Sequence, residues 1–234
     1  MQIRIQKFLS QTGICSRRQA EEYIKKGLVR LNNEVVTNLA TKIDQKRDKV
    51  ELNNKLIKSK AYIYLALNKP IGYVSSFSHK DKKTLTSLVK IKEHLGYAGR
   101  LDEDSEGLML LTNDGDLIYK LTHPKFEHEK EYLVEVYKPI PEAIIQRISK
   151  GMKLFEGKTN PVKIYRLTSN KARIILNEGK KRQIRRMFQI VGFEVKNLKR
   201  VRIENILLGD LKSGQTRELS KEELIELKKR VSLD

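Results

Sequence analysis

The sequence predicts an α+β protein in which a small basic N-terminal module precedes a larger domain, built on a largely antiparallel mixed sheet flanked by helices. Short helical and strand patterns fill the first 60 residues, and a lysine-rich stretch at 57–60 ends them. Beyond it, strands and helices alternate without a regular strand–helix repeat, which argues against a doubly wound parallel sheet. We therefore expect domains at residues 1–59 and 60–234.

Charge and composition indicate the class of partner. The 234 residues are 39% hydrophobic, which is typical of a globular chain, and carry a net charge of +19. Such an excess attracts phosphate groups and favours a nucleic acid partner. An anionic membrane is the other candidate, but no stretch approaches the roughly 20 apolar residues of a membrane span, and the N-terminus lacks the apolar core of a signal peptide. The sequence thus predicts a cytoplasmic protein without a membrane partner.

Two helices are predicted at the start of the basic module. Apolar residues in 5–9 have helical spacing, and Gly13 can end this helix in the left-handed conformation. Ser16 then opens a second helix, because Ser16 and Gln19 have the spacing of a capping box. Gly27 is expected to end the second helix.

Short strands are expected to complete the module. The apolar runs 28–31 and 34–36 flank Asn32-Asn33, and the run 50–52 precedes Asn53-Asn54. Because asparagine tolerates a positive φ, each asparagine pair predicts a tight turn between strands.

The charge of the module points to phosphate binding. Residues 1–60 contain 14 Lys and Arg against six Asp and Glu, a net charge of +8. Arg17 and Arg18 fall in the first turn of the second helix, where each cation opposes the helix dipole at a cost of about 0.3–1 kcal/mol. A bound phosphate would reverse this penalty. A merely solvated basic surface is the alternative explanation.

The second domain shows four strand patterns and one marked helix pattern. The strand patterns are 62–67, 132–136, 172–176 and 202–207. In the stretch 181–191, apolar residues recur at helical spacing, with Arg182 and Arg185 beside them. Such a helix can present arginines to a cleft, although an amphipathic helix with a basic outer face explains the pattern equally well.

An acidic loop at 99–107 is the most informative segment. It holds four carboxylates, from Asp102 to Glu106, together with Arg100, between two apolar stretches. Charged residues on a loop at the edge of a core indicate a functional site. The loop partly follows a calcium-binding pattern, but Asn113 stands where that pattern needs a bidentate glutamate, so calcium is disfavoured.

No metal and no cofactor are expected. Cys15 is the single cysteine, which excludes an internal disulfide framework and a Cys-rich zinc site, and the four histidines are scattered. No glycine-rich phosphate loop follows a strand, so the sequence does not favour ATP or a dinucleotide.

Four blocks of sequence stand in a fixed order. They are Leu67-Asn68-Lys69-Pro70-x-Gly72, the run from Gly99-Arg100-Leu101-Asp102 to Asn113-Asp114-Gly115, Glu129-Lys130-x-Tyr132-x-Val134, and the run from Gly179-Lys180-Lys181-Arg182 to Met187. In order and spacing they resemble the bacterial ribosomal-RNA pseudouridine synthases that carry an N-terminal alpha-L RNA-binding domain. The resemblance covers nearly the whole chain and is closest to the branch that modifies large-subunit RNA. It implies an alpha-L RNA-binding domain, a synthase domain and isomerisation of uridine to pseudouridine.

This reaction explains why one carboxylate can suffice. The N1 glycosidic bond of a uridine breaks, the freed base turns, and C5 joins the same ribose carbon, with no net oxidation and no external energy source. By the resemblance, Asp102 matches the family's nucleophile. A carboxylate there can attack C1′ to form an ester or take the 2′ proton to give a glycal, and the sequence is compatible with both.

The resemblance also implies partners for Asp102. Tyr132 would stack on the target uracil and Lys130 would support the site, although aromatic residues in strands usually belong to the core. Arg185 would form a salt bridge with Asp102, since a shielded carboxylate needs a counter-charge.

Four further residues are implied to hold the RNA. Arg100 would fill the space left by the extruded nucleotide, because C1′ and C5 cannot be reached in a stacked helix. Leu198 would cover the second face of the base, and Arg182 and Arg186 would contact phosphates.

The N-terminal module itself resembles the alpha-L fold shared with a ribosomal small-subunit protein and tyrosyl-tRNA synthetase. Two helices followed by short strands, with Ser16-Arg17-Arg18 opening the second helix, carry this resemblance. It favours structured RNA over DNA. The residues expected to contact RNA are Arg4, Lys7, Ser16, Arg17, Arg18, Lys25, Lys26 and Arg30.

The sequence therefore predicts a monomeric enzyme whose partner is ribosomal RNA, in particular 23S RNA, or an assembling ribosomal subunit. A non-catalytic RNA-binding or ribosome-assembly factor of the same fold is the alternative. A binding protein has no need for Asp102, so this residue discriminates between the two. The modified uridine cannot be read from the sequence, because selection depends on RNA shape.

Overall fold

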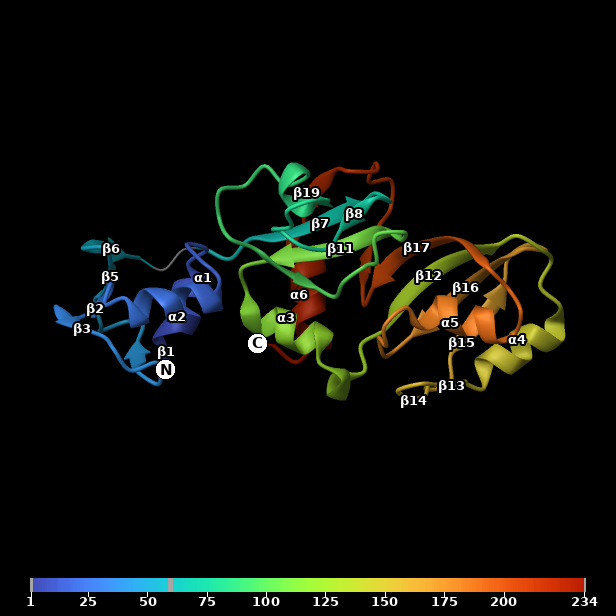
Figure 1. The fold of residues 1–234 in the computed structure, drawn as a ribbon, viewed down its shortest axis with the longest axis horizontal. Helices are drawn as coiled ribbons and strands as arrows, with labels where there is room; N and C mark the ends of the chain where they lie inside the picture. Colours follow the sequence, from blue (N-terminus) through green and yellow to red (C-terminus); the bar gives the residue numbers. More distant parts are fainter. Residues whose placement is uncertain (1, 59–60, 234) are drawn as a thin grey trace.

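The N-terminal module lies at one end of an elongated molecule (Figure 1). The structure, a computed structural model, describes residues 2–58 and 61–233, so the predicted domain boundary between residues 59 and 60 lies outside the described residues. The helices of the module are α1 (Ile5–Gln11) and α2 (Arg17–Lys25), and its strands are β1 (Gln2–Arg4), β2 (Val29–Leu31), β3 (Glu34–Val35), β4 (Lys42–Asp44), β5 (Val50–Leu52) and β6 (Lys55–Ile57).

Local signals set the ends of these elements as predicted. The Ser16 hydroxyl accepts the backbone N–H of Gln19, and the Gln19 side chain accepts the backbone N–H of Ser16, which completes the capping box. Gly13 and Gly27 follow the two helices with φ of +73° and +68°. Both asparagine pairs have positive φ in the turns β2–β3 and β5–β6. The buried side chains of the module form one core of their own.

A nine-stranded mixed sheet forms the second domain. Its strands are β7 (Tyr64–Lys69), β10 (Gly96–Ala98), β11 (Glu106–Thr112), β12 (Lys130–Val136), β15 (Lys163–Arg166), β16 (Lys171–Leu176), β17 (Val195–Ile203), β18 (Ile206–Leu207) and β19 (Thr216–Glu218). The main order is β15-β16-β12-β17-β11-β7-β19, with β10 beside β11 and β18 beside β17. Only β11 and β17 pair in parallel in this described sheet. The predicted α+β class with a largely antiparallel sheet is confirmed.

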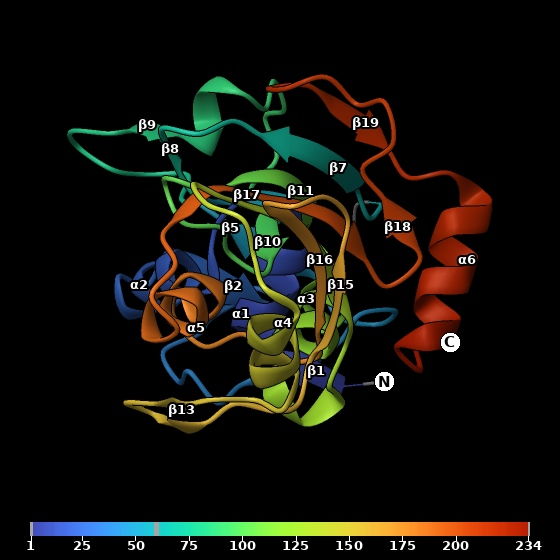
Figure 2. The ribbon, with the colours of Figure 1, turned by 90° about the vertical axis from the view of Figure 1, so that its right-hand side faces the viewer.

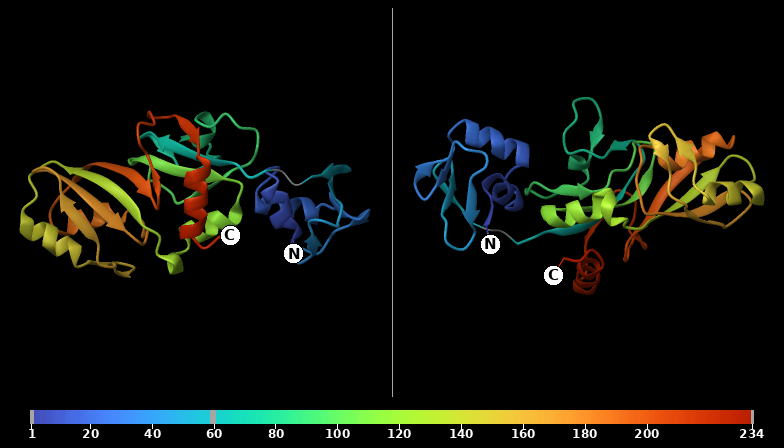
Figure 3. Two further views of the ribbon diagram at one scale, coloured as in Figure 1. Left: turned by 180° about the vertical axis from the view of Figure 1, so that it is seen from behind. Right: turned by 90° about the horizontal axis from the view of Figure 1, so that it is seen from below.

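Helices and loops cover both faces of the sheet. Alternating residues of β11 face two cores: Leu108 and Leu110 pack with α3 (Gly115–Thr122) and α6 (Lys221–Arg230), whereas Met109 and Leu111 pack with the 3₁₀ turn η1 (Leu85–Ser87). Seen from behind, α6 stands in front of the sheet (Figure 3). A third core joins α4 (Glu142–Ser149) and α5 (Gln183–Ile190) to strands β12, β15 and β16. The remaining short elements are β8 (Tyr73–Val74), β9 (Lys83–Thr84), β13 (Lys153–Leu154), β14 (Gly157–Lys158) and η2 (Pro124–Phe126).

The prediction of a single strand at 202–207 is wrong. Strand β17 begins at Val195 and ends at Ile203, Glu204 takes φ +50°, and the chain turns back into β18. The turn places Ile206 in the core shared with α6, which stands beside β18 in Figure 2. The apolar residues on both sides of the turn had the appearance of one continuous strand.

The N-terminal module contacts the second domain at the start of helix α3. The Asp116 carboxylate at its start accepts the Lys7 ammonium at 2.7 Å. Beside it, the Asn113 side chain donates to the carbonyl of Gln11 at 3.0 Å. The two domains are therefore in direct polar contact through α1 and α3.

Candidate active site

A cavity of about 820 Å³ opens beside the acidic loop. Its walls come from the loop itself, the end of α3 with the segment that follows it, the start of β12, the segment 176–184 and β17. The side chains of Arg100, Asp102, Lys130, Tyr132, Arg182 and Leu198 all line it. The structure thus brings together six residues that the sequence singled out for the catalytic centre.

Backbone and hydroxyl contacts fix the acidic loop. The Ser75 hydroxyl donates to the carbonyl of Leu101 at 2.6 Å and accepts its N–H at 3.0 Å. The N–H of Gly72 donates to the carbonyl of Glu103 at 2.8 Å. Between these anchors, Asp102 faces the cavity with 39% of its side chain exposed.

Arg200 ties the two ends of the loop together from beneath. It is 1% exposed, and its guanidinium donates to the carbonyl of Leu108 at 2.6 Å and to that of Gly99 at 3.2 Å. Gly107 pairs with Arg200 where β11 and β17 run in parallel, with φ +107°. A Cβ at Gly107 would lie 2.2 Å from the carbonyl oxygen of Arg200, so only glycine fits where these two strands pair.

The predicted ion pair between Arg185 and Asp102 is wrong: among the described residues, Arg185 pairs with Asp104. Its Nε lies 3.2 Å from the Asp104 carboxylate, and its Nη2 donates to the Asp104 carbonyl at 2.7 Å. Arg182 holds the same carboxylate with two hydrogen bonds of 3.0 and 2.7 Å, and lies 3.8 Å from Asp102. Asp104 therefore anchors the loop to α5, and Asp102 is left toward the cavity.

The electrostatics of Asp104 follow from this pairing. Partial burial alone would raise the pKa of its carboxyl, but the hydrogen bond from Arg182 and the charges of Arg185 and Arg182 together hold the pKa below its usual value. The anchor is thus ionised at neutral pH.

Two buried amines stand near the loop. Burial lowers the pKa of Lys130 from 10.5 to about 8, a shift to which the charge of Arg200 adds. Burial likewise lowers the pKa of Lys69 to about 8, against the opposing effect of Asp102. Lys130 lines the cavity, whereas Lys69 is fully buried and donates to the carbonyls of Pro70 and Tyr73.

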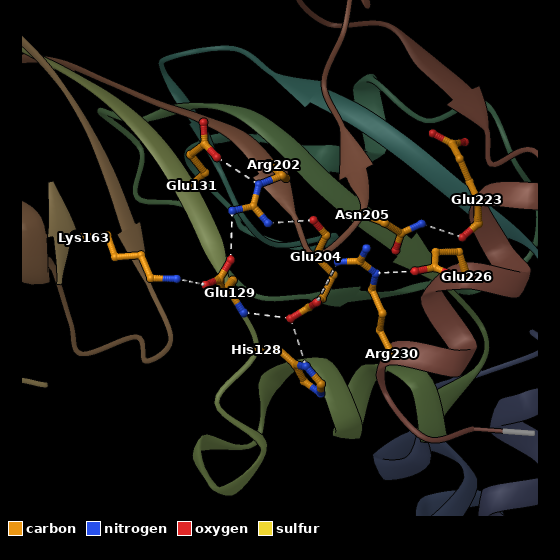
Figure 4. A network of polar contacts seen from close by, with 10 residues as sticks. All are labelled: His128, Glu129, Glu131, Lys163, Arg202, Glu204, Asn205, Glu223, Glu226 and Arg230. Carbon is orange, nitrogen blue, oxygen red and sulfur yellow. Dashed lines mark hydrogen bonds and ion pairs between the residues drawn. The ribbon is translucent and has the colours of Figure 1, made fainter. Parts of the chain in front are cut away.

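The polar network in Figure 4 holds the start of β12. The same strand carries Lys130 and Tyr132. The Glu204 carboxylate accepts the N–H of Glu129 at 2.8 Å and lies 3.1 Å from Nδ1 of His128. Arg202 binds Glu129 at 3.1 Å and Glu131 at 2.9 Å. The carbonyl of His128 accepts the Lys130 ammonium at 3.0 Å, so the network also fixes the position of Nζ.

Arg186 lies outside the cavity lining, in contrast to Arg182. Its Nη1 bonds both carboxylate oxygens of Glu156, in the turn between β13 and β14, at 2.8 and 3.1 Å. The expected phosphate contact of Arg186 would require this pair to open.

The residues expected to contact RNA in the N-terminal module divide into two groups. Six are exposed cations: Arg4, Arg17, Arg18, Lys25, Lys26 and Arg30. The other two have structural partners, because Ser16 caps α2 and Lys7 pairs with Asp116.

Sequence reasoning missed Arg200, Lys69 and His128 as parts of the site. A signal existed for Arg200, because residues two positions apart in a strand point to the same face and Leu198 was already expected at the site. Both residues line the cavity. Lys69 stands in one of the four blocks, but nothing in its type announces burial. His128 has no comparable signal.

Comparisons with known proteins identify the family of both parts of the chain. A model of the RNA pseudouridylate synthase family matches residues 63–190, and a model of the S4 domain matches residues 3–48. The dual-specificity RNA pseudouridine synthase RluF of Escherichia coli K12 is 40% identical over 230 residues, covering 96% of this chain and 78% of the relative. Ribosomal large subunit pseudouridine synthase B of Bacillus subtilis is 38% identical, covering 96% and 95%.

A solved structure has the same fold over nearly the whole chain. The crystal structure of a pseudouridylate synthase superimposes with a TM-score of 0.70 at 32% identity, covering 96% of this chain and 99% of the other.

Across the described residues, no helix is long and apolar enough to span a membrane.

Proposed function

The chain belongs to the RNA pseudouridylate synthase family, whose members are isomerases acting on RNA, and from this premise we propose that it converts uridine to pseudouridine in large-subunit ribosomal RNA, with Asp102 as the essential carboxylate. Two relatives named for pseudouridine synthesis, one of them on the large ribosomal subunit, support this substrate. The observation that carries the proposal is the position of Asp102 on the wall of an 820 Å³ cavity, beside Lys130 and Tyr132.

The proposed chemistry needs only groups of this chain. The N1–C1′ bond breaks, the uracil turns within the cavity, and a C5–C1′ bond forms; C5 gives up its proton and N1 gains one, so product and substrate are isomers. The Asp102 carboxylate either bonds to C1′ or takes the 2′ proton. The cavity holds the freed base between these steps, which prevents its escape to water.

Neighbouring side chains are proposed to position the nucleotide. Tyr132 and Leu198 offer an aromatic ring and an apolar surface to the two faces of the uracil. Arg100 is exposed at the cavity and can replace the flipped nucleotide in the RNA stack. Arg182 and the Lys130 ammonium supply positive charge for the backbone.

Asp104 and Arg185 are proposed as positioning residues. Their contacts hold the loop against α5, which leaves Asp102 free of a buried partner and accessible to C1′. In this arrangement Arg185 acts on Asp102 through the loop backbone.

The N-terminal module is proposed to bind RNA outside the cavity, with a boundary at residues 59–60. The S4 match and the six exposed cations support this role. We further propose action as a monomer in the cytoplasm, where bacterial ribosomal RNA is made.

Mapping of pseudouridines in ribosomal RNA tests the proposal. Cells that lack the protein should lose pseudouridine at one or a few positions of large-subunit RNA, and the wild-type gene, but not Asp102→Asn, should restore it. An unchanged map in the deletion strain contradicts the proposed substrate.

A further inference from the structure

Aromatic rings and lysines gather where α3 passes into η2. This α3–η2 cluster comprises Tyr119, Lys120, His123, Lys125 and Phe126. The ring of Tyr119 lies 5.1 Å from that of His123 and 5.6 Å from that of Phe126. The ammonium groups of Lys120 and Lys125 each lie 4.7 Å from the centre of the Phe126 ring, and Lys125 also lies 5.4 Å from that of Tyr119.

The cluster is a surface feature and not part of the core. Tyr119 is 46% exposed, and His123 and Lys125 are exposed. None of its five residues belongs to the four cores formed by the described residues. Lys120 and Phe126 are half-buried, and the Phe126 ring stacks on that of His128, so Tyr119 and His123 are the two rings of the cluster that are open to a ligand.

The chemistry of the cluster matches a single-stranded nucleic acid. Unpaired bases stack on exposed aromatic side chains, and nearby cations neutralise their phosphates. Lys125 lies over the Tyr119 ring, and both lysines lie over the neighbouring Phe126 ring, so a base stacked on Tyr119 would have ammonium groups close to its phosphate. Paired RNA offers no free base face and would gain only the charge.

The location of the cluster connects the two parts of the proposed RNA path. Its His123, with the adjacent Pro124, lines the cavity. The opposite end of α3 bonds the N-terminal module through Asp116 and Lys7. Since α3 has eight residues, it spans about 12 Å between these two points.

We propose that the α3–η2 cluster binds unpaired nucleotides beside the target uridine, by stacking on Tyr119 and His123 and by phosphate contacts with Lys120 and Lys125. This inference rests on the proposed function. It adds a binding surface for single-stranded RNA between the cavity and the N-terminal module.

Binding of an oligouridylate to the full chain tests the proposal. A fluorescein-labelled strand of about 12 nucleotides is titrated with the wild type, Tyr119→Ala, Tyr119→Phe and Lys125→Met, and fluorescence anisotropy is recorded at several salt concentrations. Tyr119→Ala should weaken binding at least about fivefold, and Tyr119→Phe should restore it to within about twofold of the wild type. Lys125→Met should reduce the slope of log affinity against log salt by about 0.7.

The chain offers a matched pair of controls away from the cavity. Tyr137 is 66% exposed, and the Lys138 ammonium lies 4.6 Å from the Phe193 ring, so Tyr137→Ala and Lys138→Met remove comparable groups. Both should bind the oligouridylate within about twofold of the wild type. Equal losses in the control pair, or Tyr119→Ala binding within about twofold of the wild type, overturn the proposal.

Two further measurements separate this inference from other causes. Thermal unfolding identifies a variant that fails to fold, and in that case Lys125→Met decides the outcome. A wild type that forms pseudouridine while Tyr119→Ala and Lys125→Met both bind the strand like the wild type defeats the inference alone. Conversely, a wild type that forms none while Tyr119→Ala loses affinity for the strand defeats the proposed function alone.

Discussion

Lys130 places a titratable amine on the wall of the cavity. Burial lowers its pKa to about 8, so the group is largely ammonium below that pH and largely neutral above it. The charged form is the one that can attract an RNA backbone or the charge developing on the uracil. The rate of the reaction should therefore depend on pH through the protonation of Lys130.

We predict an alkaline limb near pH 8 in the profile of kcat/KM. Activity should fall as the pH rises through the pKa of Lys130, because the ammonium is lost there and not at the usual 10.5. Lys130→Arg should keep its charge and shift the limb upward, and Lys130→Gln should be less active at pH 7. A limb that stays near pH 8 in Lys130→Arg would assign the titration to Lys69, whose pKa is also about 8.

Arg185 and Arg182 are predicted to act differently although both bind Asp104. Arg185→Met removes bonds to the Asp104 carbonyl and to the Val195 carbonyl, so the loop should shift and kcat should fall at least about tenfold at every pH. Arg182→Met removes a more exposed group at the cavity and should chiefly raise KM. Steady-state kinetics of both variants decide the matter, and the reverse pattern would contradict the assignment.

At the scale of elements, the parallel pairing of β11 with β17 determines the position of the acidic loop. The two strands pair in parallel only at Glu106–Gly107, next to Arg200, and the loop emerges directly before this point. The pairing of these two strands therefore determines where the loop places Asp102.

Substitution of Gly107 tests whether this close pairing of β11 with β17 requires glycine. Gly107→Ala would force a Cβ against the Arg200 carbonyl at a positive φ, so the free energy of unfolding should fall by about 2 kcal/mol or more in urea denaturation. Gly115→Ala is the matched control, since a Cβ there meets nothing within 4 Å in the first turn of α3; its unfolding free energy should stay the same or rise by up to about 1 kcal/mol. Equal effects of the two substitutions would show that close approach at Gly107 is unimportant.

Elements governed by local chemistry could be predicted from the sequence. The Ser16 cap, the glycines after α1 and α2 and the asparagine turns depend on neighbouring residues alone, and all agree with the structure. The apolar stripe of α5 likewise fixed which side of that helix enters the core. The family resemblance then supplied the residues around the cavity, which periodicity could not identify.

Features that depend on distant contacts were not predictable. Asp102 and Asp104 are equivalent in residue type and two positions apart, and only the path of the loop backbone decides which one meets Arg185. The turn at Glu204 has no glycine or asparagine at its left-handed position, and contacts with His128 and Glu129 in another strand region accompany it. The burial of Arg200 likewise results from the pairing of β11 with β17.

At the scale of the molecule, positive charge spreads over two domains in contact through α1 and α3. A net charge of +19 attracts RNA as a whole, and the exposed cations of α2 direct part of this attraction to the N-terminal module. The proposed division of labour gives affinity to the module and chemistry to the cavity. It also implies that the two functions can be separated by substitution.

Arg17 and Arg18 provide that separation. The double variant Arg17→Ala/Arg18→Ala should weaken binding of ribosomal RNA fragments and lower the slope of log affinity against log salt by about 1 for each phosphate that the protein no longer neutralises, while kcat stays near the wild-type value. Lys196→Ala, which removes an exposed lysine paired with Glu135, is the control and should leave the slope unchanged. A double variant with the wild-type slope would rule out phosphate binding by the start of α2.

Isomerisation of uridine in large-subunit ribosomal RNA through Asp102 is the central activity proposed for this chain. The most direct measurement uses RNA transcribed with tritium at C5 of uridine, because the C5–C1′ bond of pseudouridine forms with loss of the C5 hydrogen to water. Purified wild-type protein should release tritium up to a fixed number of uridines per RNA, and Asp102→Asn should release none above background while binding the RNA with similar affinity. Release by Asp102→Asn at a rate within about tenfold of the wild type, or no release by the wild type from any segment of large-subunit RNA, would contradict this assignment.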